Sequence, residues 1–150
     1  MPAKPTIDVL LLRADQPDRA TVVPIERDYR AMQAIVGGYI QSLRLNGEVA
    51  AYLDEDGKFS GRPVNPAANK VVFLANPGLA DDDFVVGDAV LVGLLDADGN
   101  QDGVEHCAPP AAFDLCHRAG LEVVDQDGRP VDAMQLVTAA ALDLGGRSLG

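Results

Sequence analysis

The stretch from Tyr39 to Leu53 reads Tyr-Ile-Gln-Ser-Leu-Arg-Leu-Asn-Gly-Glu-Val-Ala-Ala-Tyr-Leu and contains the clearest local folding signal in the sequence. Two strand-like runs, Tyr39 to Leu45 and Glu48 to Leu53, flank the dipeptide Asn46-Gly47. A two-residue type I′ turn needs positive φ at both central positions, which Asn-Gly readily supplies. The stretch therefore predicts an antiparallel β-hairpin.

Upstream of this hairpin, the sequence predicts another hairpin and then a helix. Ile7 to Arg13 and Thr21 to Glu26 are strand-like runs separated by a turn-rich segment. Asp28 can cap the helix, and Gly37-Gly38 can end it. The apolar residues between them fall at helical spacing and are Tyr29, Met32, Ile35 and Val36.

Downstream of the hairpin, the pattern is less regular. A proline-rich connection with a short helical turn at Ala67 to Asn69 leads to a predicted strand from Val71 to Leu74. Phe84 to Leu95 is apolar apart from Gly87-Asp88. It predicts a central strand that either bends at the glycine or is entered through a tight turn there, beginning at Ala89.

The last third of the sequence predicts two helices and a short strand. One helix begins at Pro109 or Pro110 and runs to Ala119, a strand follows from Leu121 to Val124, and a capping-box pattern opens a final helix from Asp132 to Leu144. Strands interspersed with helices predict an α+β fold, with a single mixed or antiparallel sheet and about three helices packed on it. No segment is long enough to act as a linker, so residues 1–150 are expected to form a single globular domain.

The charge of the chain narrows the classes of partner. The 150 residues carry a net charge of −11. This excess of acid disfavours binding to nucleic acid or to an anionic membrane surface. The sequence shows neither a signal peptide nor a stretch of apolar residues that could span a bilayer, and it contains two cysteines. We therefore expect a cytoplasmic protein with reduced thiols.

Three sequence elements, taken together, resemble a known family. They are the segment from Tyr29 to Ile40, which ends in Val-Gly-Gly-Tyr-Ile, the segment from Asp54 to Lys58 together with Gly61 to Ala68, which contains Gly-Arg-Pro-Val-Asn, and the segment from Val86 to Gly93. They resemble an uncharacterised family of small proteins encoded largely by actinobacterial phages, plasmids and other mobile elements. The likeness covers residues 7 to 95 and is to a domain of unknown function. The resemblance implies an accessory product of a mobile element and brings no assigned catalytic residues.

Two groups of residues have the composition of a metal site. His106, Cys107, Cys116 and His117 supply two thiols and two imidazoles, but their spacing does not match the common zinc patterns. Asp98 to Asp102 begins like a calcium loop, yet Pro109 stands where the bidentate Glu is needed. A buried thiol at Cys116 and an Asp-Gly turn explain the same residues, and we expect no metal and no cofactor.

The best candidates for binding residues lie in the elements that carry the resemblance. The loops around them are conformationally restrained and sit on a rigid sheet, where ligand contacts are often found. A structural interpretation is also available, because the glycines suit a sharp helix-to-strand reversal and the asparagine suits a turn. The candidates are Gly37, Gly38, Tyr39, Arg62 and Asn65.

The function expected from these observations is binding. The sequence contains no nucleophile elbow, phosphate loop or metalloprotease motif, so nothing in it positively supports an enzyme. We expect a small soluble binding or interaction protein of a mobile element, directed at a host component, with a protein or small-molecule ligand and with homo-oligomers allowed. A small-molecule enzyme and an acidic mimic of nucleic acid, with Asp81 to Asp83 as a run of three aspartates, are the alternatives.

Overall fold

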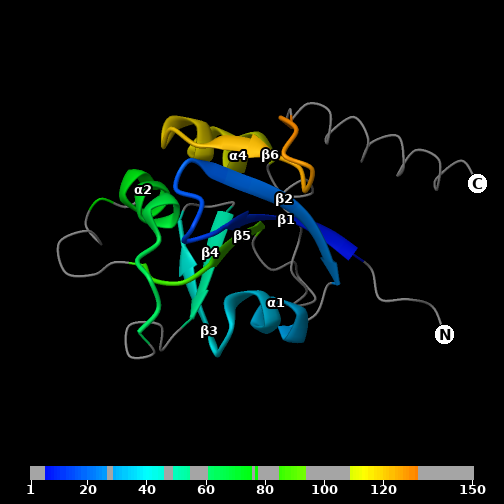
Figure 1. The fold of residues 1–150 in the computed structure, drawn as a ribbon, viewed down its shortest axis with the longest axis vertical. Coiled ribbons are helices and arrows are strands. Elements are labelled where there is room, and N and C mark those ends of the chain that lie inside the picture. Colours follow the sequence, from blue (N-terminus) through cyan, green and yellow to red (C-terminus); the bar gives the residue numbers. More distant parts are fainter. Residues whose placement is uncertain are drawn as a thin grey trace, which may run out of the picture.

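A computed structural model of the chain describes residues 6–26, 29–45, 49–54, 61–75, 77, 85–93 and 109–131. Within these residues the strands form one mixed six-stranded sheet in the order β3-β4-β5-β1-β2-β6 (Figure 1). The elements are β1 (Thr6–Leu12), β2 (Arg19–Glu26), α1 (Tyr29–Val36), β3 (Ile40–Arg44), β4 (Val49–Asp54), α2 (Pro66–Ala75), β5 (Ala89–Gly93), α4 (Pro109–Arg118) and β6 (Glu122–Val124). The predicted α+β class is confirmed.

Both predicted hairpins are present. β3 pairs antiparallel with β4, and the backbone N–H of Leu45 donates to the carbonyl of Val49 at 3.0 Å. The predicted turn residues Asn46-Gly47 lie outside the described residues. β1 pairs antiparallel with β2 and, on its other side, with β5. The only parallel pair among the described strands joins β2 to β6.

The predicted central strand is confirmed in its shorter form. β5 lies between β4 and β1, and all five of its residues are buried. The chain enters it through Gly87, whose φ of +73° is in the left-handed region. Just before this glycine, Val86 forms an isolated bridge with Val64. Gly87 therefore turns the chain into the sheet, and the strand does not continue through it.

The predicted strand from Val71 to Leu74 is wrong, because this segment belongs to α2. Four apolar residues are too few to distinguish a strand from a buried turn of helix. The helix begins where Asn65 caps it, with its side-chain Oδ1 accepting the N–H of Ala68 at 2.9 Å, and Pro66 occupies the first helical position. Its buried residues then recur at helical spacing and are Ala67, Ala68, Val71 and Val72.

The helices cover both faces of the sheet. α2 and α4 pack on one face, in a cluster that includes Leu10, Leu91 and Phe113 (Figure 1). α1 lies on the opposite face, where Met32 and Val36 pack against the side chains that alternate with the first set. None of the helices in the described ranges is long and apolar enough to cross a membrane.

The C-terminal predictions are confirmed as far as the structure describes them. α4 begins at Pro109 and β6 follows it, close to the predicted bounds. The predicted helix from Asp132 to Leu144 lies outside the described residues.

Phe113 provides a test of the two-layer core. Its side chain is 1% exposed beneath the sheet, whereas Phe73 on α2 is 43% exposed. We expect Phe113→Ala to lower the free energy of unfolding by about 3–5 kcal/mol, because it leaves a cavity. Phe73→Ala removes the same atoms from a more exposed site and should cost less than about 1 kcal/mol. Urea denaturation measures both values, and equal losses would contradict the packing described here.

Candidate functional site

The guanidinium of Arg62 brings three of the predicted binding residues into one place. Its Nη1 donates to the carbonyl of Val36 at 3.1 Å, and its Nη2 donates to the carbonyl of Gly37 at 2.7 Å. These carbonyls lie at the C-terminal end of α1, where backbone acceptors lack helical partners. On its third side, Nε lies 2.9 Å from Oδ2 of Asp54, whose side chain is 4% exposed. Arg62 therefore caps a helix and neutralises a buried carboxylate.

The glycines of the same elements leave room for this ion pair. A Cβ on Gly37 would lie 2.6 Å from both Nη atoms of Arg62, and a Cβ on Gly38 would lie 2.9 Å from Oδ1 of Asp54. Gly87 approaches the aliphatic part of the same side chain, since its Cβ would lie 2.8 Å from Cδ of Arg62. Three segments of the chain thus close around one arginine.

Asn65 is fully buried and fully occupied by the backbone. Its Nδ2 donates to the carbonyls of Leu12 and Gly87, each at 2.9 Å, while its Oδ1 caps α2. It joins the end of β1, the entry to β5 and the start of α2. Tyr39 differs from the other candidates because 68% of it is exposed. A binding role for the five residues stays a prediction, and Tyr39 is the one most open to a partner.

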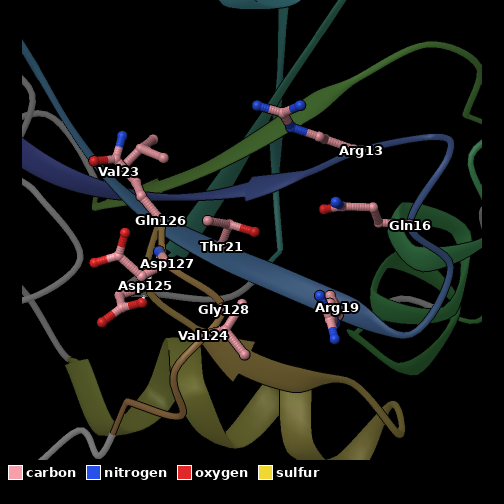
Figure 2. A pocket seen from close by; sticks show the side chains of 10 residues that line it. All are labelled: Arg13, Gln16, Arg19, Thr21, Val23, Val124, Asp125, Gln126, Asp127 and Gly128. Atoms are coloured by element: carbon pink, nitrogen blue, oxygen red, sulfur yellow. Dashed lines mark hydrogen bonds between the residues drawn. The ribbon is translucent and has the colours of Figure 1, made fainter.

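A pocket of about 360 Å³ lies elsewhere, across the β2–β6 edge of the sheet (Figure 2). Figure 2 shows two arginines at one end of it and two aspartates at the other, with Thr21 between them. Val23 and Val124, which also line it, are buried. The lining residues are Arg13, Gln16, Arg19, Thr21, Val23, Val124, Asp125, Gln126, Asp127 and Gly128.

The arginine end of the pocket is built by the connection between β1 and β2. The N–H of Gln16 donates to the carbonyl of Arg13 at 3.1 Å, and the N–H of Arg19 donates to the carbonyl of Gln16 at 3.4 Å. Each of these hydrogen bonds joins residues three apart, as in a β-turn, and the second turn begins where the first one ends. They place Arg13, Gln16 and Arg19 along the same pocket.

Contacts with three other segments hold this connection against the rest of the molecule. The N–H of Ala14 donates to Oδ1 of Asp88 at 3.0 Å, and the N–H of Glu122 donates to the carbonyl of Asp18 at 2.8 Å. Lys70 of α2 adds a 3.6 Å contact to the Asp18 carboxylate. The arginines therefore project from a backbone that is already fixed.

The aspartate end of the pocket is the tight turn that follows β6. The Oδ1 atom of Asp125 accepts the N–H groups of Asp127 and Arg129, at 2.9 and 3.0 Å. Gly128 takes a φ of +82°, and the chain then returns so that Pro130 bridges Val124. Asp125 to Gly128 thus form a turn that lines the same pocket as the two arginines.

Sequence reasoning missed the pocket residues. The local signal is the spacing Arg13-x-x-Gln16-x-x-Arg19 around a turn-rich segment. The other wall depends on the pairing of β2 with β6, which no local pattern predicts. The sequence contains the spacing that forms the arginine wall, but no neighbouring segment indicates which residues lie opposite it.

Comparison with known proteins gives a family without an assigned function. The profile of a domain of unknown function, DUF3846, matches residues 7–108. The chain belongs to the DUF3846 family. No curated protein and no solved structure matches it. The match includes Arg62 and the arginine wall of the pocket, while α4, β6 and the aspartate wall lie beyond its end.

Cys116 is the cysteine of this DUF3846 protein that lies within the described residues, and its thiol is enclosed. Cys116 on α4 is fully buried, and desolvation by burial raises its pKa to about 12, so the metal-binding thiolate is strongly disfavoured. The adjacent His117 is exposed. Within the described residues, no group of three or more His, Cys, Asp or Glu side chains could hold a metal ion. His106, Cys107 and the segment from Asp98 to Asp102 lie outside those residues.

Alanine substitutions at two glycines test the Arg62 contacts. Gly37 and Gly61 both have positive φ, at +89° and +70°, but a Cβ on Gly61 would meet nothing within 4 Å. Gly61→Ala should cost about 1–2 kcal/mol through backbone strain. Gly37→Ala should cost roughly 1–3 kcal/mol more, because it also displaces a hydrogen-bonded guanidinium. Chemical denaturation measures the difference, and equal costs would contradict a close contact with Arg62.

The burial of Cys116 predicts both its reactivity and a pH dependence. At pH 8, iodoacetamide should alkylate Cys116 much more slowly in the folded protein than in urea, as followed by mass spectrometry of its peptide. The unfolded thiol loses its proton near pH 9.0 and the folded thiol near 12, so its contribution to stability falls as pH rises through this interval. Cys116→Ala should lack that pH dependence. Equal alkylation rates with and without urea would contradict the burial.

Proposed function

We propose that this DUF3846 protein binds a small molecule in the pocket at the β2–β6 edge. The observation that carries the proposal is the arrangement of charge there, with Arg13 and Arg19 at one end and Asp125 and Asp127 at the other (Figure 2). A volume of about 360 Å³ falls within the range of small-ligand sites, which are about 300–1,000 Å³. Opposite charges at the two ends of the pocket attract a charged ligand and determine its orientation.

The rigidity of the arginine wall supports this proposal. Ordering flexible groups costs affinity, and a wall whose backbone is held before binding reduces that cost. The connection between β1 and β2 is fixed by the Asp88 carboxylate and by the backbone of Glu122. The turn opposite is held by the Asp125 carboxylate. Both walls are therefore organised without a ligand.

The biological setting is a proposal of a different kind. The sequence resemblance supports a role for the protein in a mobile genetic element, acting in the cytoplasm on a host component or on a metabolite of the host.

A macromolecular partner is the second candidate, favoured by one observation. Tyr39 is 68% exposed beside β3, which ends the sheet as the structure describes it. Exposed aromatic residues of this type often anchor protein interfaces.

Thermal unfolding in the presence of charged metabolites tests the proposed pocket. At 100 times its Kd, a ligand stabilises the folded state by about 2.7 kcal/mol, which corresponds to a rise in Tm of roughly 5–10 °C for a chain of this size. The double variant Arg13→Ala/Arg19→Ala should lose most of that rise.

The control is Arg44→Ala/Arg118→Ala, which removes the same charge from exposed positions outside the pocket and should retain the rise in Tm. A ligand whose effect is the same in both double variants would contradict binding in the pocket. Chemical conversion of the bound ligand, followed by mass spectrometry, would identify the protein as an enzyme that uses this site.

A further inference from the structure

We infer that the ligand of this pocket is a small zwitterion, with its anionic group at the arginine end and its cationic group at the aspartate end. This inference rests on the proposed binding function and adds the chemical class of the ligand. It follows from the state of the charged groups at each end of the pocket and from the net charge of the whole chain.

The two arginines are available to an anionic group. Among the described residues, neither guanidinium has an ion-pair partner, in contrast to Arg62 with Asp54 and Arg118 with Asp114. Arg13 and Arg19 are exposed at the rim, with Gln16 between them along the chain. Guanidinium groups bind carboxylates through paired N–H donors in a planar fork. The arginine end therefore suits a carboxylate.

The aspartate end is available to a cationic group. Asp125 uses Oδ1 to accept two backbone N–H groups, which fixes the orientation of its carboxylate. Within the described part of the chain, Oδ2 of Asp125 and both oxygens of Asp127 accept no hydrogen bond. An ammonium group can donate three hydrogen bonds and fits such a pair of acceptors.

The charge of the whole protein favours a ligand of zero net charge. The chain carries −11, so a simple anion meets long-range repulsion before it reaches the arginines. A simple cation is attracted to many acidic sites on this surface, not to this pocket in particular. A zwitterion avoids the repulsion and satisfies both ends of the pocket. A zwitterion therefore binds this pocket in preference to the acidic sites elsewhere on the surface.

The part of the ligand that separates the two charges spans the middle of the pocket. Val124 is 2% exposed and Val23 is 8% exposed, and Thr21 lies between the charged ends (Figure 2). Valines this deeply buried offer a ligand little apolar surface, so the part of the ligand between the two charges acts mainly through its length. The ligand class is thus a short zwitterion with an ammonium at one end and a carboxylate at the other.

Isothermal titration calorimetry with a graded series of compounds tests this inference. The probes are glycine, β-alanine, 4-aminobutyrate and 6-aminohexanoate, each compared with the alkanoate and the alkylamine of the same length, such as hexanoate and hexylamine for the longest probe. One length in the zwitterionic series should bind with a Kd at least about fivefold lower than the singly charged analogues of that length, because each of these forgoes one charge contact.

Charge-removing variants then assign the two ends. Arg19→Gln should weaken binding of the best zwitterion about three- to tenfold and leave the corresponding alkylamine unaffected. Asp127→Asn should weaken the zwitterion similarly and leave the corresponding alkanoate unaffected. Arg44→Gln and Asp114→Asn, which change exposed residues away from the pocket, are the matched controls and should alter none of these affinities.

The outcomes separate this inference from the proposed function. If the alkanoate binds as tightly as the zwitterion and depends on Arg19, the ligand is a simple anion and the inference is wrong while the pocket remains a binding site. If no probe of the series binds but another metabolite binds in a way that depends on the arginines, the inference is again wrong while the pocket remains a binding site. If no ligand depends on Arg13 or Arg19, both proposals are wrong.

Discussion

The ion pair between Arg62 and Asp54 is the constraint on which the arrangement of several elements depends. Asp54 ends β4 with its side chain 4% exposed, and a carboxylate in that position needs a cationic partner. Arg62 reaches it while also binding the last carbonyls of α1, so the end of a helix and the end of a strand are fixed to each other. Removing either partner would leave a charge in a poorly solvated place, which costs more than the pair itself contributes. The glycines that line this contact are small because the arginine fills the space.

Side-chain amides and carboxylates extend the same principle to the connections between elements. Asn65 binds backbone groups of β1 and of the entry to β5, and Asn69 binds both the N–H and the carbonyl of Val85. Asp88 then accepts the N–H of Ala14. Irregular backbone that is buried needs such partners, because it has no ladder to satisfy it. The outcome is a set of fixed loops, of which the β1–β2 connection forms the arginine wall of the pocket.

Local patterns were sufficient to predict much of this fold, and long-range pairing accounts for what they missed. The β3–β4 hairpin and α1 follow from an Asn-Gly turn and from helical spacing with a glycine stop, which are properties of adjacent residues. The apolar run from Val71 to Leu74 predicts a strand, but the segment is helical because Asn65 caps α2 and because its buried residues recur at helical spacing. The sequence indicates Arg62 as a binding candidate because the local pattern of an arginine in a proline-rich loop is the same in two cases. The arginine can contact a ligand, or it can pair with a carboxylate of its own chain. The pocket could not be predicted, since its two walls meet only when Arg19 of β2 lies beside Glu122 of β6.

The parallel pairing of β2 with β6 also has a consequence for the order in which the molecule is assembled. β6 comes late in the chain, so β2 has an unpaired edge during synthesis until α4 and β6 dock against it. The proposed pocket lies across this seam and is absent while the seam is open. A ligand that touches both walls therefore binds only the closed molecule and shifts the docking equilibrium toward it by mass action. Slower amide hydrogen exchange in β6 would then accompany occupancy, and ligand supply would influence how much of the protein has completed its sheet.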